Sequence, residues 1–304
     1  MNPSYLLVLL GVVMVSYSGP LVKGGLLAGA NPVTVATLRM LFSFLLLTPV
    51  MLWRRGGQAA PILSVKKMTR RQWLWSLAAS LCLALHYLTW MTSLDSTSTF
   101  ASVALVCTQP LFVAFFSYVL FHERTPRRAL PGALLALVGA VTIALSGLAG
   151  QGAQAAGSDA LRSNLLALAG AVLMAAHWLA GRQIRQTLAA EVYTPVLYLI
   201  TAALLALCLP LSGGFRMPLS ALPYMAGLVI GSTLLGHAVF AYALSGVSAN
   251  VISFALLGEP VGAMIFSMIF FGEVPTWPVA LGGLLTLVGL ALYLAFAGGE
   301  KQPA

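Results

Sequence analysis

The chain has 304 residues, of which 60% are hydrophobic and only 8% are charged. Soluble globular domains carry about 25% charged residues, so this composition excludes that class and indicates an integral membrane protein. The formal net charge of +9 would suit nucleic acid or anionic lipid, but the basic residues gather between apolar segments, which points to membrane topology instead. We therefore expect contacts with membrane lipids and no nucleic-acid partner.

Apolar segments of about the length of a membrane crossing recur along the chain, separated by glycine, proline and charged residues. Because lipid cannot satisfy open backbone groups, we predict that each segment is an α-helix. The first segment lacks the basic start of a signal peptide and is predicted to be the first crossing. In chain order, the ten predicted helices cover 4–23, 32–53, 73–93, 98–121, 129–148, 163–181, 192–211, 219–243, 248–271 and 276–296.

The positive-inside rule assigns the ends of these helices to the two sides of the membrane. With the N-terminus in the cytoplasm, ten crossings return the C-terminus to the cytoplasm and place twelve Lys and Arg residues there. Three, Lys23, Arg162 and Arg216, fall on the opposite side, and Arg39 lies within a span. The twelve are Arg54, Arg55, Lys66, Lys67, Arg70, Arg71, Arg124, Arg127, Arg128, Arg182, Arg185 and Lys301.

The two halves of the chain repeat one another. Shifted by 150 residues, QPLFVAFFSYVLFHERTPRRALPGALLALVG, from residue 109, aligns without a gap with EPVGAMIFSMIFFGEVPTWPVALGGLLTLVG, from residue 259. A shift of 151 residues extends the match upstream. The matches that apolar composition does not explain are Pro110 with Pro260, Glu123 with Glu273, Gly132 with Gly282, Gly139 with Gly289, and His86 with His237.

Each copy contains five predicted helices, and an odd number of crossings inverts the second copy relative to the first. The predicted fold class is therefore all-α integral membrane, with ten transmembrane helices as two inverted five-helix repeats. This architecture is typical of secondary transporters, whose halves rock around a central site. Glu123 and Glu273 then lie at opposite membrane edges, which favours a helix-terminal structural role for Glu273.

Ionisable groups within spans cost about 2.5 to 3.5 kcal/mol on insertion scales, so each is a candidate for the transport path. Glu259 lies near the middle of the ninth predicted helix. Pro260 cannot donate to the carbonyl of Leu256, so the helix is expected to break beside the carboxylate. Gln109 and Pro110 repeat this arrangement in the fourth predicted helix. These two breaks predict the centre of the site, with a carboxyl buried for packing as the alternative.

His86 and His237 occupy equivalent places in the third and eighth predicted helices. Either could carry a coupling proton, because histidine titrates near neutral pH; the alternative is an interhelical hydrogen bond. Trp90 shares the face of His86 at i,i+4, whereas Tyr87 is expected to point elsewhere. Such aromatic faces could hold a cation or stack on a substrate, or pack in the core. The remaining path candidates are His177 and Trp178 in the sixth predicted helix and Tyr17 in the first.

Arg39 lies about 10 Å inside the second predicted helix. It could reach Glu259 if the second and ninth helices are neighbours, as a structural ion pair or as a ligand for a substrate carboxylate. Glycines at helical spacing predict that the fifth and tenth helices pack tightly, within or between subunits, and contribute little to the path. An aromatic belt at the membrane interface is predicted from Trp53, Trp73, Trp75 and Trp277.

The sequence contains few residues that could catalyse a reaction or bind a metal. The cysteines Cys82, Cys107 and Cys208 lie in apolar segments without metal-ligand spacing and are predicted to be small buried hydrophobic residues. No HExxH or GxSxG motif occurs. We expect no metal, no cofactor and no enzymatic activity, with a membrane-embedded lipid-modifying enzyme as a distant alternative.

The paired segments TQPLFVAFFSYVLFHE…LPGALLALVG and GEPVGAMIFSMIFFGE…LGGLLTLVG resemble the two copies of the EamA domain of the drug/metabolite transporter superfamily. NPVTVATLRM, which contains Arg39, resembles the second-helix signature of that family. Two departures stand out: His122 replaces the Gly before the first repeat's Glu, and no arginine of the second repeat matches Arg39. The resemblance implies repeats at 1–148 and 162–297, a linker at 149–161 and a tail at 298–304.

The resemblance also implies a carrier in the bacterial inner membrane, with both termini in the cytoplasm. Members of the family often export amino acids or other metabolites, some by proton exchange. We therefore predict an exporter of small metabolites such as amino acids, a monomer or homodimer, in which substrate and proton compete at Glu259. A carrier of organic cations, quaternary amines or drugs is the alternative.

Overall fold

A computed structural model describes residues 3–54, 65–122, 126–146, 158–188, 190–236, 239 and 255–297. Two residues singled out in the repeat, Glu123 and His237, lie outside the described residues, as do parts of the predicted eighth and ninth spans, most of the predicted linker and the predicted tail. The predicted linker, 149–161, also overlaps a helix that already begins at Ser158. Asp159 in the first turn of that helix favours a helix start at this point.

Within these ranges every regular element is a helix. Seven spans are long and apolar enough to cross a membrane, and three shorter apolar helices cover Val192–Cys208, Leu219–Leu235 and Gly258–Phe271. The chain is therefore an all-helical, multi-pass membrane protein. The helices are α1 (Pro3–Ser16), α2 (Ser18–Leu27), α3 (Pro32–Arg54), α5 (Arg70–Ser93), α6 (Thr99–Val106), α7 (Gln109–Phe121), η1 (Arg127–Ala129), α8 (Leu130–Ser146), α9 (Ser158–Arg185), α10 (Ala190–Cys208), η2 (Pro210–Ser212), η3 (Leu219–Ala221), α11 (Leu222–Ala226), the π-helix η4 (Gly227–Leu235), α14 (Gly258–Phe271) and α15 (Trp277–Ala297).

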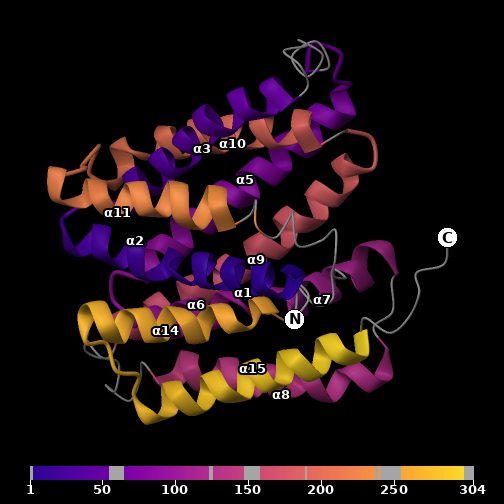
Figure 1. The fold of residues 1–304 in the computed structure, drawn as a ribbon. Helices are drawn as coiled ribbons and strands as arrows, with labels where there is room; N and C mark the ends of the chain where they lie inside the picture. The colour runs from indigo at the N-terminus through magenta and orange to yellow at the C-terminus, as the bar shows by residue number, and fades with distance from the viewer. Residues whose placement is uncertain are drawn as a thin grey trace.

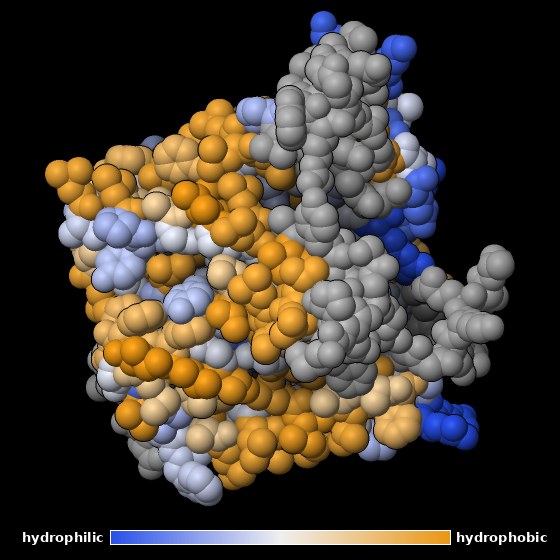
Figure 2. All heavy atoms as spheres, in the orientation of Figure 1, coloured by the Kyte–Doolittle hydropathy of each residue, from blue (hydrophilic) through white to orange (hydrophobic). Residues whose placement is uncertain are grey.

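The surface of the bundle divides into an apolar flank and a basic end. Figure 2 shows a mostly hydrophobic face, with the strongly hydrophilic residues gathered at the end where α5 begins. An apolar flank suits contact with lipid, and a basic end suits one membrane surface. We call this end the basic end and the other the opposite end. Six exposed Lys and Arg residues are described at the basic end, whereas Arg162 and Arg216 are exposed at the opposite end; the six are Lys66, Lys67, Arg70, Arg71, Arg127 and Arg128.

Three crossings are interrupted. A single residue, Tyr17, separates α1 from α2, and two residues, Cys107 and Thr108, separate α6 from α7. A turn at Leu257 precedes α14. In each case the last helical residue lies four residues before a proline, because proline has no N–H and its ring clashes with the carbonyl at that distance. The last helical residues and their prolines are Ser16 with Pro20, Val106 with Pro110, and Leu256 with Pro260.

Helices α8 and α15 lie side by side, backbone against backbone (Figure 1). A Cβ atom added at Gly139 would lie 2.5 Å from the carbonyl oxygen of Gly282, and one at Gly289 would lie 2.7 Å from the carbonyl oxygen of Gly132. Only glycine leaves room for this approach. The predicted tight packing of the fifth and tenth helices is thus confirmed, and it occurs within one chain.

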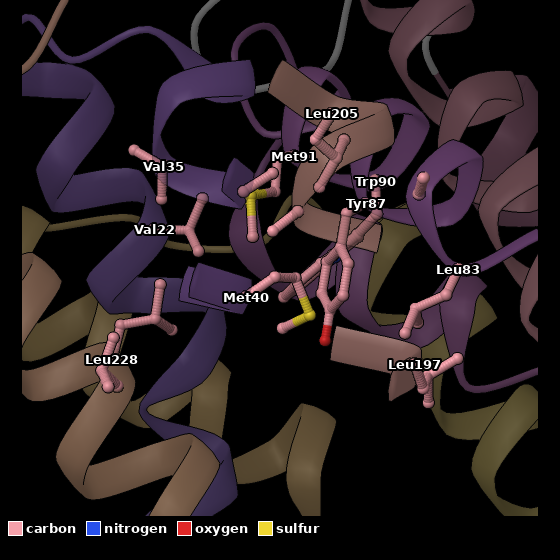
Figure 3. Packing of buried hydrophobic residues seen from close by; sticks show 14 of the residues in the cluster. Val22, Val35, Met40, Leu83, Tyr87, Trp90, Met91, Leu197, Leu205 and Leu228 are labelled. Carbon is pink, nitrogen blue, oxygen red and sulfur yellow. The ribbon is translucent and has the colours of Figure 1, made fainter. Parts of the chain in front are cut away.

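Helix α5 packs along α9, and α3 packs along α10 (Figure 1). A buried apolar core joins these four helices to α2 and η4. Figure 3 shows part of this core, with Val22 and Met40 on one side of Tyr87 and Trp90, and Leu197 near Leu83. The interrupted helices meet one another beside this core.

Candidate functional site

The three interruptions converge through α14. A Cβ atom at Gly262 of α14 would lie 2.6 Å from the Cβ of Ser16, so the two backbones approach closely where α1 ends. The Tyr17 ring stacks on Phe266 of α14, with ring centroids 3.8 Å apart. On the other side, α14 packs against α6, which ends directly before Cys107. Discontinuous helices that meet in this way are where transporter sites form.

Arg39 enters this region from α3 and is buried. Its Nε donates to Thr233 Oγ1 at 3.0 Å, and its Nη1 donates to Ser18 Oγ at 3.2 Å. The Thr233 hydroxyl itself donates to the carbonyl of Leu228, five residues earlier in the π-helix η4, at 3.0 Å. Since a hydroxyl has one proton, that bond leaves the Thr233 oxygen to accept from Arg39.

The guanidinium of Arg39 also lies over two aromatic rings of α5. Its Cζ is 5.1 Å from the ring centroid of Tyr87 and 6.0 Å from that of Trp90, within cation–π range. The expectation that Tyr87 points elsewhere is therefore wrong. Residues three apart on a helix are neighbours just as residues four apart are, so Tyr87 and Trp90 share a face, and Figure 3 shows the two side by side.

Glu259 lies in the first turn of α14, where the helix dipole favours negative charge. Its carboxylate is close enough to Arg39 for their charges to interact. In the described part of the chain, however, the ion pair within 4.0 Å is that of Lys23 with Glu273, and none joins Arg39 to Glu259. The site thus holds one positively and one negatively charged side chain, Arg39 and Glu259, that do not form a direct ion pair.

Three further polar atoms here are buried without a hydrogen-bond partner among the described residues: Trp90 Nε1, Gln109 Oε1 and Ser16 Oγ. Buried polar atoms of this kind are rare in native proteins and call for an explanation. The Trp90 N–H is a donor beside Arg39. The Gln109 oxygen is an acceptor at the start of α7, two residues after Cys107. With Arg39 and Glu259 they give this region hydrogen-bond donors as well as acceptors.

Two of the three described histidines, His86 and His177, bridge α5 and α9 reciprocally. His86 Nδ1 of α5 lies 2.9 Å from the Gly170 carbonyl oxygen of α9, and His177 Nδ1 of α9 lies 2.9 Å from the Ala79 carbonyl oxygen of α5. A carbonyl only accepts, so each Nδ1 carries the proton and donates. This is the interhelical hydrogen bond weighed as the alternative role. His86 also stacks on Trp90, at a centroid distance of 5.8 Å, and so remains beside the site.

Of the other residues predicted to line the path, Tyr17 lies near Arg39 and Glu259 and Trp178 does not. Tyr17 lies at the α1–α2 interruption, against α14. The side chain of Trp178 is 56% exposed, so it lies outside the cluster around Arg39. Nothing in the described residues groups three His, Cys, Asp or Glu side chains as a metal site would require.

A second polar cluster lies at the opposite end of the bundle. It consists of Lys23, Glu273 and the backbone groups that they bind, and we call it the latch. Lys23 of α2 and Glu273, which follows α14, form an ion pair at 3.8 Å, although their side chains are only 3% and 4% exposed. Lys23 Nζ also donates to the carbonyls of Leu94, at 2.5 Å, and Thr97, at 3.4 Å, in the α5–α6 connection. Glu273 Oε2 accepts the backbone N–H of Thr99, the first residue of α6, at 3.0 Å.

The latch ties four separate segments together: α2, the α5–α6 connection, the start of α6 and the end of α14. The helix-terminal role predicted for Glu273 is present, since its carboxylate caps α6, a helix distant in sequence. Lys23, in contrast, is predicted from the sequence only as a basic residue on the non-cytoplasmic side, whereas the structure buries it. Its position inside an apolar, glycine-rich helical run was the signal that it had a buried partner.

Sequence reasoning also missed Ser18 and Thr233, which hold Arg39, and Gly262, which admits Ser16. A serine or threonine in an apolar helix gives no sign of its partner when that partner is 21 or 194 residues away. The π-helix that orients Thr233 has no distinct sequence pattern either.

Comparisons with known proteins agree with this architecture. A model of the EamA-like transporter family matches residues 2–145 and 161–295 of the chain. Curated proteins provide no match. Solved structures that match include one described only as "Crystal structure of protein", with a TM-score of 0.65 and 20% identity over 98% of this chain and 99% of that chain. At that identity the likeness concerns the fold alone.

Proposed function

Because the chain belongs to the EamA-like transporter family, we propose that it is a secondary carrier that exports small metabolites, amino acids in particular, by alternating access. The two matched segments, 2–145 and 161–295, each supply five crossings. The seven long spans and three shorter apolar helices together make ten. Five is odd, so the second repeat is inverted, and the two halves rock about the interrupted helices.

The basic end of the bundle is the cytoplasmic end in this proposal, since cytoplasmic loops carry the excess of Lys and Arg. Both termini then lie in the cytoplasm, and the membrane is the bacterial inner membrane. The latch lies on the outer side. The described conformation is therefore one in which the outer end is closed.

The substrate assignment rests on one observation: Arg39 and Glu259 carry opposite charges in one site without forming a direct ion pair. The carboxylate of an amino acid would bind Arg39, which can donate from two nitrogens at once, and the Trp90 N–H beside it. The ammonium group would bind Glu259, with the free acceptor of Gln109 nearby. A zwitterion would thus satisfy the Trp90 N–H and the Gln109 oxygen, which have no hydrogen-bond partner among the described residues.

An organic cation, the alternative substrate, would have to use the aromatic faces of Tyr87 and Trp90. Those faces are already covered by the guanidinium of Arg39. A second cation there would meet both a steric block and a like charge. This arrangement favours the zwitterion over a quaternary amine.

Glu259 is also the group at which a proton would compete with substrate. When the ammonium group leaves, the carboxylate loses its counter-charge in a buried site, and protonation replaces it. One proton would then return for each amino acid exported. Neutral Gln109, at the matching place in the first repeat, cannot make this exchange.

Proteoliposomes test both parts of the proposal. Vesicles loaded with single amino acids, quaternary amines or sugars are assayed for efflux, with and without a pH gradient. We expect amino-acid efflux that a gradient accelerates, and we expect the Glu259→Gln variant to bind or exchange substrate without any dependence on the gradient. Asp159→Asn, which removes an exposed carboxylate, is the matched control and should behave as the unaltered protein. Efflux of quaternary amines alone would refute the substrate assignment, and an unchanged gradient dependence in Glu259→Gln would refute its coupling role.

A further inference from the structure

A long groove runs along the lipid-facing surface between α7 and α8. It consists of two cavities of about 560 and 500 Å³ that have lining residues in common, so they are continuous. Consecutive helices leave this space because α7 packs mainly on α9, whereas α8 packs mainly on α15. Its floor is formed by α9, through Leu168 and Val172. The shared residues are Leu111, Phe115, Leu130 and Ala133.

The two parts of the groove differ in chemistry. The mouth, at the basic end, is lined by Arg127 of η1, whose side chain is exposed, and by Tyr118 of α7. Arg128 follows in the chain and is also exposed. The inner part is lined by apolar residues and Thr108, and the Thr108 hydroxyl already donates to the carbonyl of Leu105 at 2.7 Å. A ligand that fits both parts has an anionic head and a long apolar chain.

The length of the groove excludes a small metabolite. Its lining extends from Arg127 to Ala144 along one helical crossing, and the seventeen steps between these two residues correspond to about 26 Å at the helical rise. The hydrocarbon core of a bilayer is about 30 Å thick. An occupant with its head at the basic end would therefore run through most of the membrane.

We propose that this groove is a binding site for one anionic phospholipid, whose phosphate pairs with Arg127 and one of whose acyl chains fills the space between α7 and α8. An anionic phospholipid fits for two reasons. Its phosphate complements the charge of Arg127 at the mouth, and its acyl chain matches the apolar inner part, which is nearly as long as the membrane is thick. The inner part reaches Thr108, at the interruption between α6 and α7, so the acyl chain packs against the hinge of that crossing. Bound anionic lipid therefore stabilises the described conformation.

Native mass spectrometry of the purified protein with equimolar phosphatidylglycerol and phosphatidylcholine tests the site. We expect one phosphatidylglycerol per chain, retained at least fivefold in preference to phosphatidylcholine. Arg127→Gln should lower that preference about fivefold, which corresponds to about 1 kcal/mol for one basic residue at an anionic surface. Arg71→Gln removes an exposed arginine of the same end and should leave the preference unchanged.

A larger side chain inside the groove tests the binding of the acyl chain separately. Ala133→Phe should reduce retention of both lipids at least fivefold, whereas Val138→Phe, on a lipid-facing position of α8 outside the groove, should not. Phosphatidylglycerol should also raise the melting temperature of the unaltered protein but not that of Arg127→Gln, a surface change that spares the fold. Equal retention of the two lipids by the unaltered protein would overturn the proposal. So would a dimer whose second copy occupies the groove.

Discussion

The latch predicts a specific shift in the conformational equilibrium when Glu273 is neutralised. At 3.8 Å the attraction between Lys23 and Glu273 is about 4 kcal/mol for an effective dielectric constant of 20. Removing one partner of a buried ion pair costs about 3 to 5 kcal/mol, because the other charge stays buried. Asp95 also interacts electrostatically with Lys23, so we expect the lower end of this range for Glu273→Gln. About 3 kcal/mol changes the ratio of closed to open outer ends about 150-fold.

Distances between spin labels at the opposite end measure that ratio. Leu27→Cys and Trp277→Cys place labels on exposed positions, each four residues beyond one partner of the latch. In a background without the three native cysteines, the distance distribution of the unaltered latch should be short and narrow. Glu273→Gln should add a second, longer population. Lys23→Met combined with Glu273→Leu should return most of the protein to the short distance, since an apolar pair leaves no buried charge.

The controls separate a latch from a general loss of charge or of fold. Asp159→Asn removes an exposed carboxylate and should leave the distances unchanged. Each variant should retain its elution volume and helical circular dichroism. If Glu273→Gln is folded and keeps the short, narrow distribution, the ion pair does not hold this end closed, and the reasoning from its burial is wrong.

Two other substitutions test contacts elsewhere in the bundle. Thr233→Val removes the acceptor for Arg39 Nε and should weaken amino-acid binding about tenfold or more, because hydrogen bonds to charged groups contribute about 1.5 to 3 kcal/mol; Thr233→Ser should bind normally in calorimetry. Gly139→Ala places a methyl group 2.5 Å from the carbonyl oxygen of Gly282 and should lower thermal stability by about 1 to 3 kcal/mol. Gly231→Ala, where no atom lies within 4 Å, should not, and equal melting temperatures would argue against the close helix contact.

Much of the helical framework is predictable because it depends on local chemistry. Lipid enforces helices, and proline interrupts them at the carbonyl four residues earlier. The same rule applied to Pro20 would have predicted the interruption at Ser16, which the prediction of one continuous helix over 4–23 missed. Proline is not sufficient, however, since Pro49 and Pro195 lie inside continuous helices.

The polar contacts of the site are less predictable because their partners are distant in sequence. Periodicity correctly puts His86 and Trp90 on one face, but it does not show that Gly170 of α9 offers a carbonyl to that histidine. The same holds for Lys23, whose ion-pair partner follows α14. Helix arrangement determines these contacts, and a single chain's residue pattern contains little information on it.

The two matched interruptions differ in charge, and the proposed transport cycle depends on that difference. Arg39 and ionised Glu259 cancel, so a bound zwitterion leaves the loaded site neutral, and its export does no work against the membrane potential. A cationic substrate would add one charge, at about 2.3 kcal/mol per 100 mV, opposed by an interior-negative potential. On the return step, a protonated Glu259 leaves the charge of Arg39 uncompensated, and the same potential then favours inward movement. An amide at position 259 would fix the site's charge throughout, so the cycle needs a carboxylate there, and one carboxylate is enough to cancel the single charge of Arg39.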